Sequence, residues 1–128
     1  MLPLAQEMNI GILTRVPLDE DALSGTITES TTFPAGDFRN SYFRDDRRKQ
    51  VAERVAALVR DLDLDDVSHL PAIAIRFCLS HPAVSTVIPG MRSRSSVEKN
   101  VMASGQGPLP VKMLEILREH AWERDFYR

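Results

Sequence analysis

The stretch Ser85–Asn100, STVIPGMRSRSSVEKN, joins the end of a strand, a Pro-Gly turn, a basic serine-rich loop and the start of a helix. Its strand, Val84–Ile88, is short, apolar and β-branched, as buried strands are. Ser93 and Ser95 are alternative N-caps for the helix, and Glu98 would complete a capping box with Ser95. The stretch therefore predicts the strand-to-helix connection of an α/β fold.

A second strand and further helices are predicted on either side of this stretch. Asn9–Val16, NIGILTRV, is another apolar, β-branched run, and Pro17 ends it. Apolar residues at helical spacing predict a helix from about Asp46, a second one capped by Ser68 and a last one over Val111–Ala121. Strands separated by long helical excursions indicate βαβ connectivity and a parallel sheet.

The predicted sheet is too small to be complete. Two strands alone would leave unpaired edges, which proteins normally remove with further strands or by closing the sheet. The long polar segment Leu18–Asp46 predicts a loop, and loops of that length are usually functional or disordered. The sequence thus indicates one domain, residues 1–128, that forms part of a larger structure.

Length and composition exclude several classes of protein. A chain of 128 residues is too short for a complete (β/α)8 barrel, which needs about 250 residues. The formal charge of -2 argues against a nucleic-acid partner, and no window approaches the roughly 18 apolar residues of a membrane span. The single cysteine excludes an intramolecular disulfide and fits a cytoplasmic location. With only scattered histidines beside it, no metal site is predicted.

The segment after Val84–Ile88 has the chemistry of a phosphate site. A helix N-terminus supplies free backbone N–H groups, and here it lies beside Arg92 and Arg94. Gly90 lets a ligand approach the backbone closely. Similar turns also occur without ligands, so the residues alone leave phosphate binding and a solvated loop equally open. Neither the GxGxxG fingerprint nor a GxxxxGK[ST] loop is present.

Several segments together resemble the C-terminal part of the aldo/keto reductase family, in the bacterial branch related to potassium-channel β subunits. They are NIGILTRVPL, Ser24-Gly25, TTFPAGDFRN, RFCLSHPAVSTVIPGMRS and VEKN. The resemblance spans essentially the entire chain, and SHPAVSTVIPG is its most specific part. It implies an α/β fold, the C-terminal portion of a (β/α)8 TIM barrel, with Asn9–Val16 as the seventh strand and Val84–Ile88 as the eighth.

The resemblance also implies that the barrel binds NADP(H) at the carboxyl ends of its strands. The loop after the seventh strand would clamp the pyrophosphate with Val16, Pro17, Leu18, Ser24 and Gly25. The loop after the eighth would hold the adenosine 2′-phosphate with Gly90, Met91, Arg92 and Ser96, and adenine with Lys99 and Asn100. Arg92 is expected to supply the positive charge. The arginine or glutamine frequent at the position of Ser96 is missing, which predicts a weaker grip on the 2′-phosphate.

No residue of this chain is assigned a catalytic role. The family's catalytic Asp, Tyr, Lys and His come from the first half of the barrel, and none of their motifs is present. Tyr42 and Tyr127 lie in a polar loop and in the terminal tail, without the family context. Hydride transfer also needs the cofactor, the carbonyl carbon and a proton donor held together. The chain can therefore supply at most the grip on the cofactor.

Two hypotheses of different kinds follow. In the first, the chain is the NADP(H)-binding portion of a reductase that converts aldehydes or ketones to alcohols with NADPH, and a missing N-terminal half supplies catalysis. A chain that begins inside a helix, LPLAQE, favours this hypothesis. In the second, it is a non-catalytic half-barrel that self-associates or pairs with another half, with or without bound nucleotide. A small carbonyl substrate is expected only in a complete barrel.

Other conspicuous residues are interpreted as structural. Cys78 lies on the apolar face of a predicted helix and is expected to pack in the core. His81 follows that helix and is expected to bond to the backbone. Trp122, Phe126 and Tyr127 are expected to pack the C-terminal segment against the fold, although in the family this tail can border the substrate opening.

Overall fold

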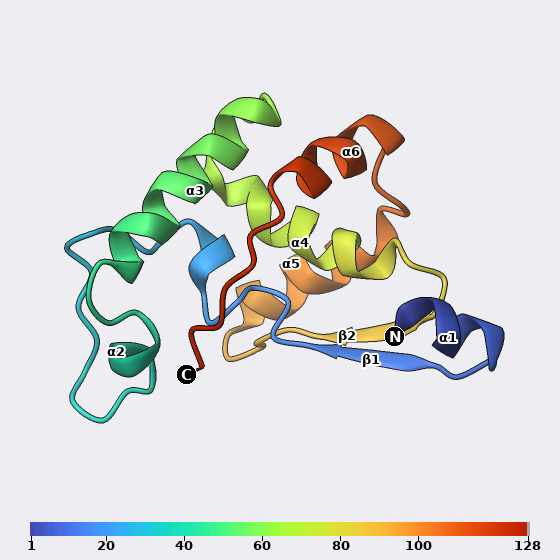
Figure 1. The fold of residues 1–128 in the computed structure, drawn as a ribbon, viewed down its shortest axis with the longest axis horizontal. Helices are drawn as coiled ribbons and strands as arrows, with labels where there is room; N and C mark the ends of the chain where they lie inside the picture. Colours follow the sequence, from blue (N-terminus) through green and yellow to red (C-terminus); the bar gives the residue numbers. More distant parts are fainter. Residues whose placement is uncertain (128) are drawn as a thin grey trace.

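The computed structural model describes residues 1–127 (Figure 1). The chain forms an α/β structure with a small parallel sheet. Its strands are β1 (Ile12–Arg15) and β2 (Val84–Ile88). Its helices are α1 (Leu2–Glu7), α2 (Arg39–Tyr42), α3 (Arg47–Asp61), α4 (Leu70–Leu79), α5 (Arg94–Gly105) and α6 (Val111–Glu119). Two short 3-10 turns, η1 (Ala22–Ser24) and η2 (Val67–His69), complete the described elements.

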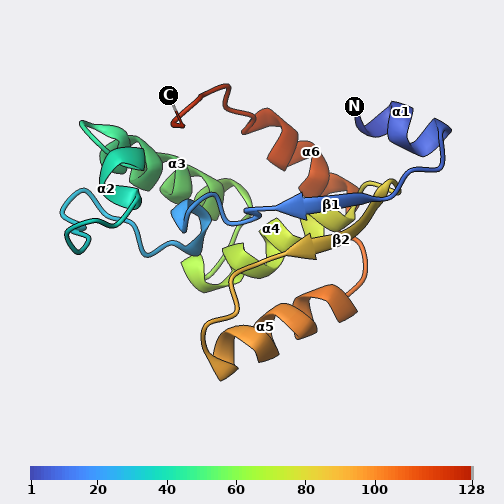
Figure 2. The same ribbon diagram turned by 90° about the horizontal axis from the view of Figure 1, so that it is seen from below.

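The sheet confirms the predicted parallel pairing of the two strands. β1 lies beside β2 with Leu13 opposite Thr86 and Arg15 opposite Ile88 (Figure 2). β2 occupies the predicted residues, whereas β1 is shorter than the predicted Asn9–Val16. The reason is the backbone, because Asn9 and Val16 have φ angles of 54° and 53°. Left-handed residues of this kind turn the chain and end a strand.

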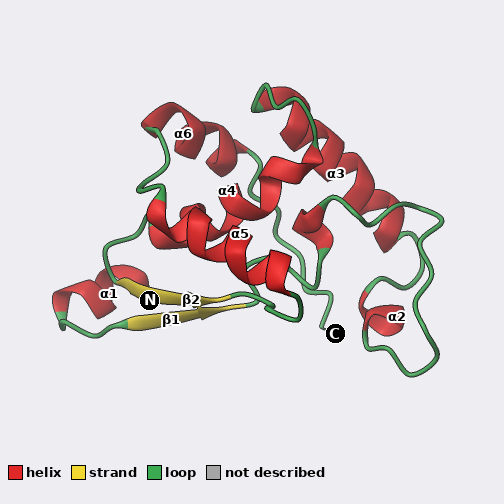
Figure 3. Cartoon of the chain, turned by 180° about the vertical axis from the view of Figure 1, so that it is seen from behind, coloured by secondary structure: helices red, strands yellow, loops and turns green. Residues whose placement is uncertain are grey.

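The helices cover one side of the sheet and leave the other side open. In Figure 1, α4, α5 and α6 all lie on the same side of the strands. α4 packs directly against β2, and α5 packs against α4 (Figure 3). On the opposite side, Leu13 and Ile88 are 62% and 52% exposed. Within residues 1–127 each strand also keeps one edge without a strand partner.

The main hydrophobic core lies away from the sheet. It fills the space between α3, the start of α4, the loop after β1 and the C-terminal tail. Val51, Val55 and Leu58 recur at helical spacing and turn one face of α3 inward, as predicted. The other buried members of this core are Ala22, Ile27, Tyr42, Phe43, Leu62, Leu70, Ile73, Leu109 and Phe126.

The long loop between β1 and α3 is ordered by aromatic contacts. Tyr42 and Phe43 are the largest fully buried side chains, and their rings meet edge to face with centroids 4.9 Å apart. Phe126 of the tail packs on Tyr42 at 5.5 Å and on Trp122 at 5.6 Å. The expected packing of the tail is therefore confirmed for Trp122 and Phe126, whereas Tyr127 is 60% exposed.

Two of the predicted helix caps are wrong. Ser68 does not cap α4, because Asp66 accepts a hydrogen bond from its backbone N–H and starts η2 instead. Ser93 caps α5, since its hydroxyl accepts from the backbone N–H of Ser96 at 3.1 Å. The capping box at Ser95 is wrong, because α5 begins one residue before it.

The interpretation of the residues around the end of α4 is confirmed for His81. The ring Nδ1 of His81 accepts a hydrogen bond from the backbone N–H of Ala83 at 3.2 Å. Cys78 is half-buried and is not among the core residues, so its expected packing in the core is not confirmed, and burial raises the pKa of its thiol. Such a thiol is a packing residue rather than a nucleophile. None of the helices within residues 1–127 is long and apolar enough to cross a membrane.

Candidate functional site

The loops that follow β1 and β2 meet in one cleft at the carboxyl ends of the strands. This end of a parallel sheet is where ligands bind in α/β folds. The cleft has a volume of about 820 Å³, within the usual range for small-molecule sites. Most of the predicted cofactor residues line it, and these are Val16, Pro17, Leu18, Ser24, Gly90, Arg92, Ser96, Lys99 and Asn100.

Two predicted cofactor residues do not line the cleft. Gly25 ends η1 with a φ of 76°, and a Cβ there would lie 2.3 Å from the Cβ of Val67. The turn therefore requires glycine for its conformation and for its packing against η2. Met91 is 49% exposed and is not among the residues that line the cleft.

The α5 side of the cleft is held by local hydrogen bonds. Asn100 is buried, and its Nδ2 donates to the backbone carbonyl of Gly90 at 3.1 Å. This bond ties the turn after β2 to the second turn of α5. No atom lies within 4 Å of the position that a Cβ on Gly90 would take. The turn thus leaves room at the helix N-terminus, where the helix dipole attracts anions.

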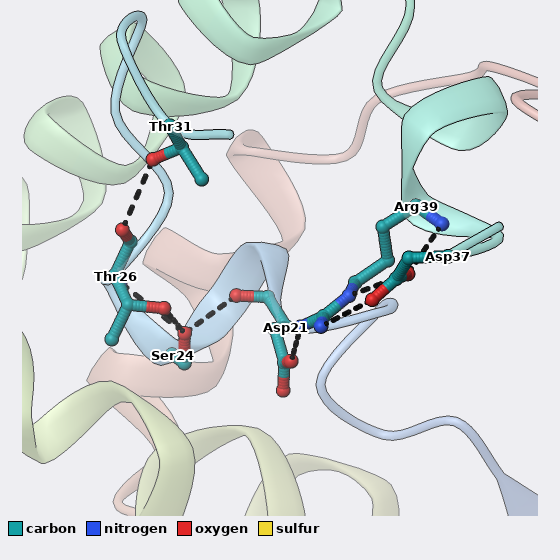
Figure 4. Close-up of polar contacts among 6 residues, drawn as sticks. All are labelled: Asp21, Ser24, Thr26, Thr31, Asp37 and Arg39. Atoms are coloured by element: carbon teal, nitrogen blue, oxygen red, sulfur yellow. Dashed lines mark hydrogen bonds and ion pairs between the residues drawn. The ribbon is translucent and has the colours of Figure 1, made fainter. Parts of the chain in front are cut away.

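The opposite side of the cleft contains an ion-pair network that the sequence did not predict. Arg39 Nη1 contacts Asp21 Oδ2 at 2.6 Å, and its Nη2 and Nε contact both Asp37 oxygens at 2.8 and 3.1 Å (Figure 4). The backbone N–H of Arg39 also donates to Asp37 Oδ1 at 2.9 Å. All these residues line the cleft, so Arg39 connects the two ends of the loop that forms this wall.

Ser24 is oriented by the same network. Its hydroxyl donates to the backbone carbonyl of Asp21 at 2.6 Å and lies 2.7 Å from the hydroxyl of Thr26 (Figure 4). Because Arg39 holds the Asp21 carboxylate, it also fixes the residue whose carbonyl positions Ser24. The wall is therefore a connected unit, in which each polar group depends on the next.

The charges of this wall are stable at neutral pH. Hydrogen bonds from Arg39 lower the pKa of Asp37 from 3.8 to about 2, burial opposes this shift, and the charges of Arg39 and Arg92 add smaller lowering effects. Asp37 raises the pKa of Arg39 in turn. Both groups therefore remain ionised across the physiological range.

Three consecutive acidic residues of this wall have left-handed backbone conformations. Asp19, Glu20 and Asp21 have φ angles of 54°, 55° and 76°. Left-handed backbone costs an L-residue roughly 1–2 kcal/mol, so the surrounding structure must hold the run in place. Each carboxylate has its own partner, and these are Arg124 for Asp19, Tyr127 for Glu20 and Arg39 for Asp21.

Tyr42 has none of the properties of an exposed proton donor. Its hydroxyl donates to Asp19 Oδ1 at 2.6 Å, and burial raises its pKa to about 12. It lies in the core rather than in the cleft lining. Residues 1–127 also contain no group of histidine, cysteine and acidic side chains arranged to hold a metal ion.

Comparison with known proteins decides the family. A search of curated proteins finds no match. The sequence model described as "Aldo/keto reductase family" matches residues 1–121, which include both strands and the entire cleft. The chain belongs to the aldo/keto reductase family. Aldo/keto reductases are oxidoreductases that generally use NAD(P)H. A cleft at the carboxyl ends of parallel strands is compatible with a partial barrel of this family.

The residues that the sequence prediction missed belong to segments that drew attention for other reasons. Asp37 and Arg39 lie within TTFPAGDFRN, one of the stretches that resemble aldo/keto reductases. An Asp-x-Arg spacing is a weak signal, because its ion pair forms only when the loop folds back on itself. Asp21 gave no signal at all, since its partner Arg39 lies 18 residues away.

Proposed function

We propose that the cleft binds NADP(H) and that the chain is the C-terminal portion, strands 7 and 8, of a (β/α)8 aldo/keto reductase. The observation that carries this proposal is the meeting of two distant segments in one cleft. Residues 16–24 and 90–100 are far apart in sequence, yet all the predicted cofactor residues except Gly25 and Met91 line the same space. Family membership supports the class of activity, and the shared lining of the cleft supports this location for the cofactor.

The residues present fit a phosphorylated dinucleotide. Arg92 and Lys99 carry positive charge into the cleft beside the α5 N-terminus, and Gly90 leaves open space there. We assign Arg92 and Ser96 to the 2′-phosphate and the segment Val16–Leu18 with Ser24 to the pyrophosphate. Lys99 and Asn100 would lie against adenine. When bound, the dinucleotide supplies the hydride, and these residues orient it.

The proposed activity of the complete enzyme is reduction of a small aldehyde or ketone to an alcohol in the cytoplasm. The Asp, Tyr, Lys and His of catalysis would come from an N-terminal half, so this chain alone is expected to be inactive. The segment SHPAVSTVIPG supports placing it in the bacterial branch related to potassium-channel β subunits.

The test compares two arginines of the same loop. Arg92→Ala should weaken NADPH binding about tenfold, the value of one charge-assisted hydrogen bond, and leave NADH binding nearly unchanged. Arg94→Ala is the matched control, because Arg94 pairs with Glu98 at 2.7 Å and does not line the cleft. Titration by fluorescence or calorimetry measures both affinities. Equal losses for NADPH and NADH would refute the assignment of Arg92, and no binding by the wild-type chain would refute the cofactor.

The open sheet favours a second candidate function, a half-barrel that pairs with another copy or another half. The large exposure of Leu13 and Ile88 and the unpaired edges of both strands support it. Analytical ultracentrifugation of the chain and of Leu13→Glu tests this candidate. Concentration-dependent association that Leu13→Glu abolishes would support pairing through the sheet, and a monomer at all concentrations would exclude self-association.

A further inference from the structure

We infer that the C-terminal tail positions the pyrophosphate wall of the cleft, with Arg124 and Tyr127 as positioning residues for cofactor binding. This inference rests on the proposed function, because it assigns a task to residues outside the cleft lining. Neither Arg124 nor Tyr127 lines the cleft. Both contact the left-handed segment 19–21, which follows the predicted pyrophosphate-binding residues Val16–Leu18 directly.

The side chains of segment 19–21 divide between the cleft and the tail. Glu20 and Asp21 line the cleft together with Leu18. Asp19 turns the other way and lines a neighbouring hollow with Trp122 and Arg124. A contact to Asp19 from the tail therefore acts on the cleft wall from behind, without meeting a bound ligand.

Arg124 and Tyr42 hold Asp19 between them. Arg124 forms an ion pair with Asp19 Oδ2, and its Nη1 donates to the Tyr42 hydroxyl at 3.3 Å. The same hydroxyl donates to Asp19 Oδ1 at 2.6 Å. Both oxygens of the carboxylate are thus occupied by groups that are themselves largely buried. Such a closed network strongly restricts the backbone of Asp19.

The guanidinium of Arg124 is fixed by the core. It lies 4.0 Å from the ring centroid of Phe126 and 4.6 Å from that of Trp122. The tail is in turn bound to α3, because Arg47 Nη1 donates to the backbone carbonyl of Phe126 at 2.9 Å. Arg124 therefore links the aromatic core to the left-handed segment 19–21.

Tyr127 provides a second contact nearer to the cleft. Its hydroxyl donates to Glu20 Oε1 at 3.2 Å. Its ring stacks on Phe38, a cleft-lining residue, with centroids 6.1 Å apart. The tail thus contacts Asp19 behind the wall, and Glu20 and Phe38 within it.

The test uses two ligands that occupy different parts of the cleft. NADPH spans both walls, whereas adenosine 2′-monophosphate reaches only the α5 side. Arg124→Gln should weaken NADPH binding about tenfold, the equivalent of one charge-assisted hydrogen bond. It should leave the affinity for adenosine 2′-monophosphate within about twofold. Arg124→Lys keeps the charge and should recover part of the loss. Arg118→Gln, at an exposed position of α6, is the control for removing an arginine near the tail.

Tyr127→Phe keeps the test decisive if Arg124→Gln does not fold. It removes a single exposed hydroxyl and should weaken NADPH binding about twofold to threefold, again without an effect on adenosine 2′-monophosphate. Equal weakening of both ligands, or no weakening of either, in the folded variants would overturn the positioning role. A wild-type chain that binds neither ligand would instead refute the proposed function on which the inference depends.

Discussion

The half of the molecule around the sheet and α5 differs from the half around α3 and the tail in what it buries. The first half buries mostly small side chains, such as Ala83 and Ala103, and exposes Leu13. The second half buries Tyr42 and Phe43 completely. The α5 wall of the cleft is therefore formed by regular secondary structure with local hydrogen bonds. The opposite wall is formed by the loop after β1, whose shape depends on aromatic and ionic contacts between distant segments.

The largest expected effect tests whether the aromatic half dominates stability. Phe43→Ala should destabilise the chain by about 3–5 kcal/mol, because it removes a fully buried ring from a packed cluster. Phe77→Ala on α4 is the matched control, since Phe77 is 44% exposed and should cost about 1 kcal/mol or less. Urea unfolding measures both changes. Similar losses for the two variants would show that stability is shared evenly between the halves.

The same division explains what the sequence could predict about the fold. Hydrophobic periodicity and turn residues are local signals, and they predicted β2 at its observed bounds and the starts of α3 and α6 to within a residue. The loop after β1 has no hydrophobic periodicity. Its order comes from contacts such as that of Phe126 with Tyr42, which lies 84 residues earlier in the chain, and a contact over that distance leaves no local pattern.

The candidate site follows the same rule. The α5 wall was predictable, because a capped helix after a glycine turn is visible in sequence. Most residues of the other wall were predicted only from the resemblance to aldo/keto reductases. Arg39 and Arg124 were not predicted, since an arginine that forms buried ion pairs looks the same in sequence as a solvated one.

The turn at Gly25 tests the contact between the loop and η2. Gly25→Ala combines two penalties, a left-handed backbone worth about 1–2 kcal/mol and a Cβ that would lie 2.3 Å from Val67. Gly107→Ala is the matched control, because its φ is 75° and no atom lies within 4 Å. Thermal unfolding should show the larger loss for Gly25→Ala, by about 1–3 kcal/mol. The double variant Gly25→Ala/Val67→Ala should recover part of it, and equal losses at both glycines would exclude the clash.

The loop half should also respond to acid through Asp37. Its pKa is about 2 in the folded chain, below the ordinary 3.8, because Arg39 hydrogen-bonds to its carboxylate. A lowered pKa means that this contribution to stability is present above about pH 4 and is lost as the pH falls through 2. Arg39→Gln should move the pKa of Asp37 back toward 3.8, measured by NMR titration of the carboxyl group. Arg94→Gln should leave it unchanged, and a shift of equal size there would remove Arg39 as the cause.

The smallest expected effect tests whether the α5 wall is stabilised mainly by its own local hydrogen bonds. Ser93→Ala removes the cap that accepts from the Ser96 N–H at 3.1 Å and should cost about 1 kcal/mol. Ser95→Ala lies inside the helix and should cost less than about 0.5 kcal/mol. Hydrogen exchange should accelerate at the first amides of α5 in Ser93→Ala and stay unchanged in α3. Because Ser96 lines the cleft, faster exchange there with an intact α3 would mean that one wall can loosen while the other keeps its shape. Acceleration in both helices would instead mean that the two halves unfold as one unit.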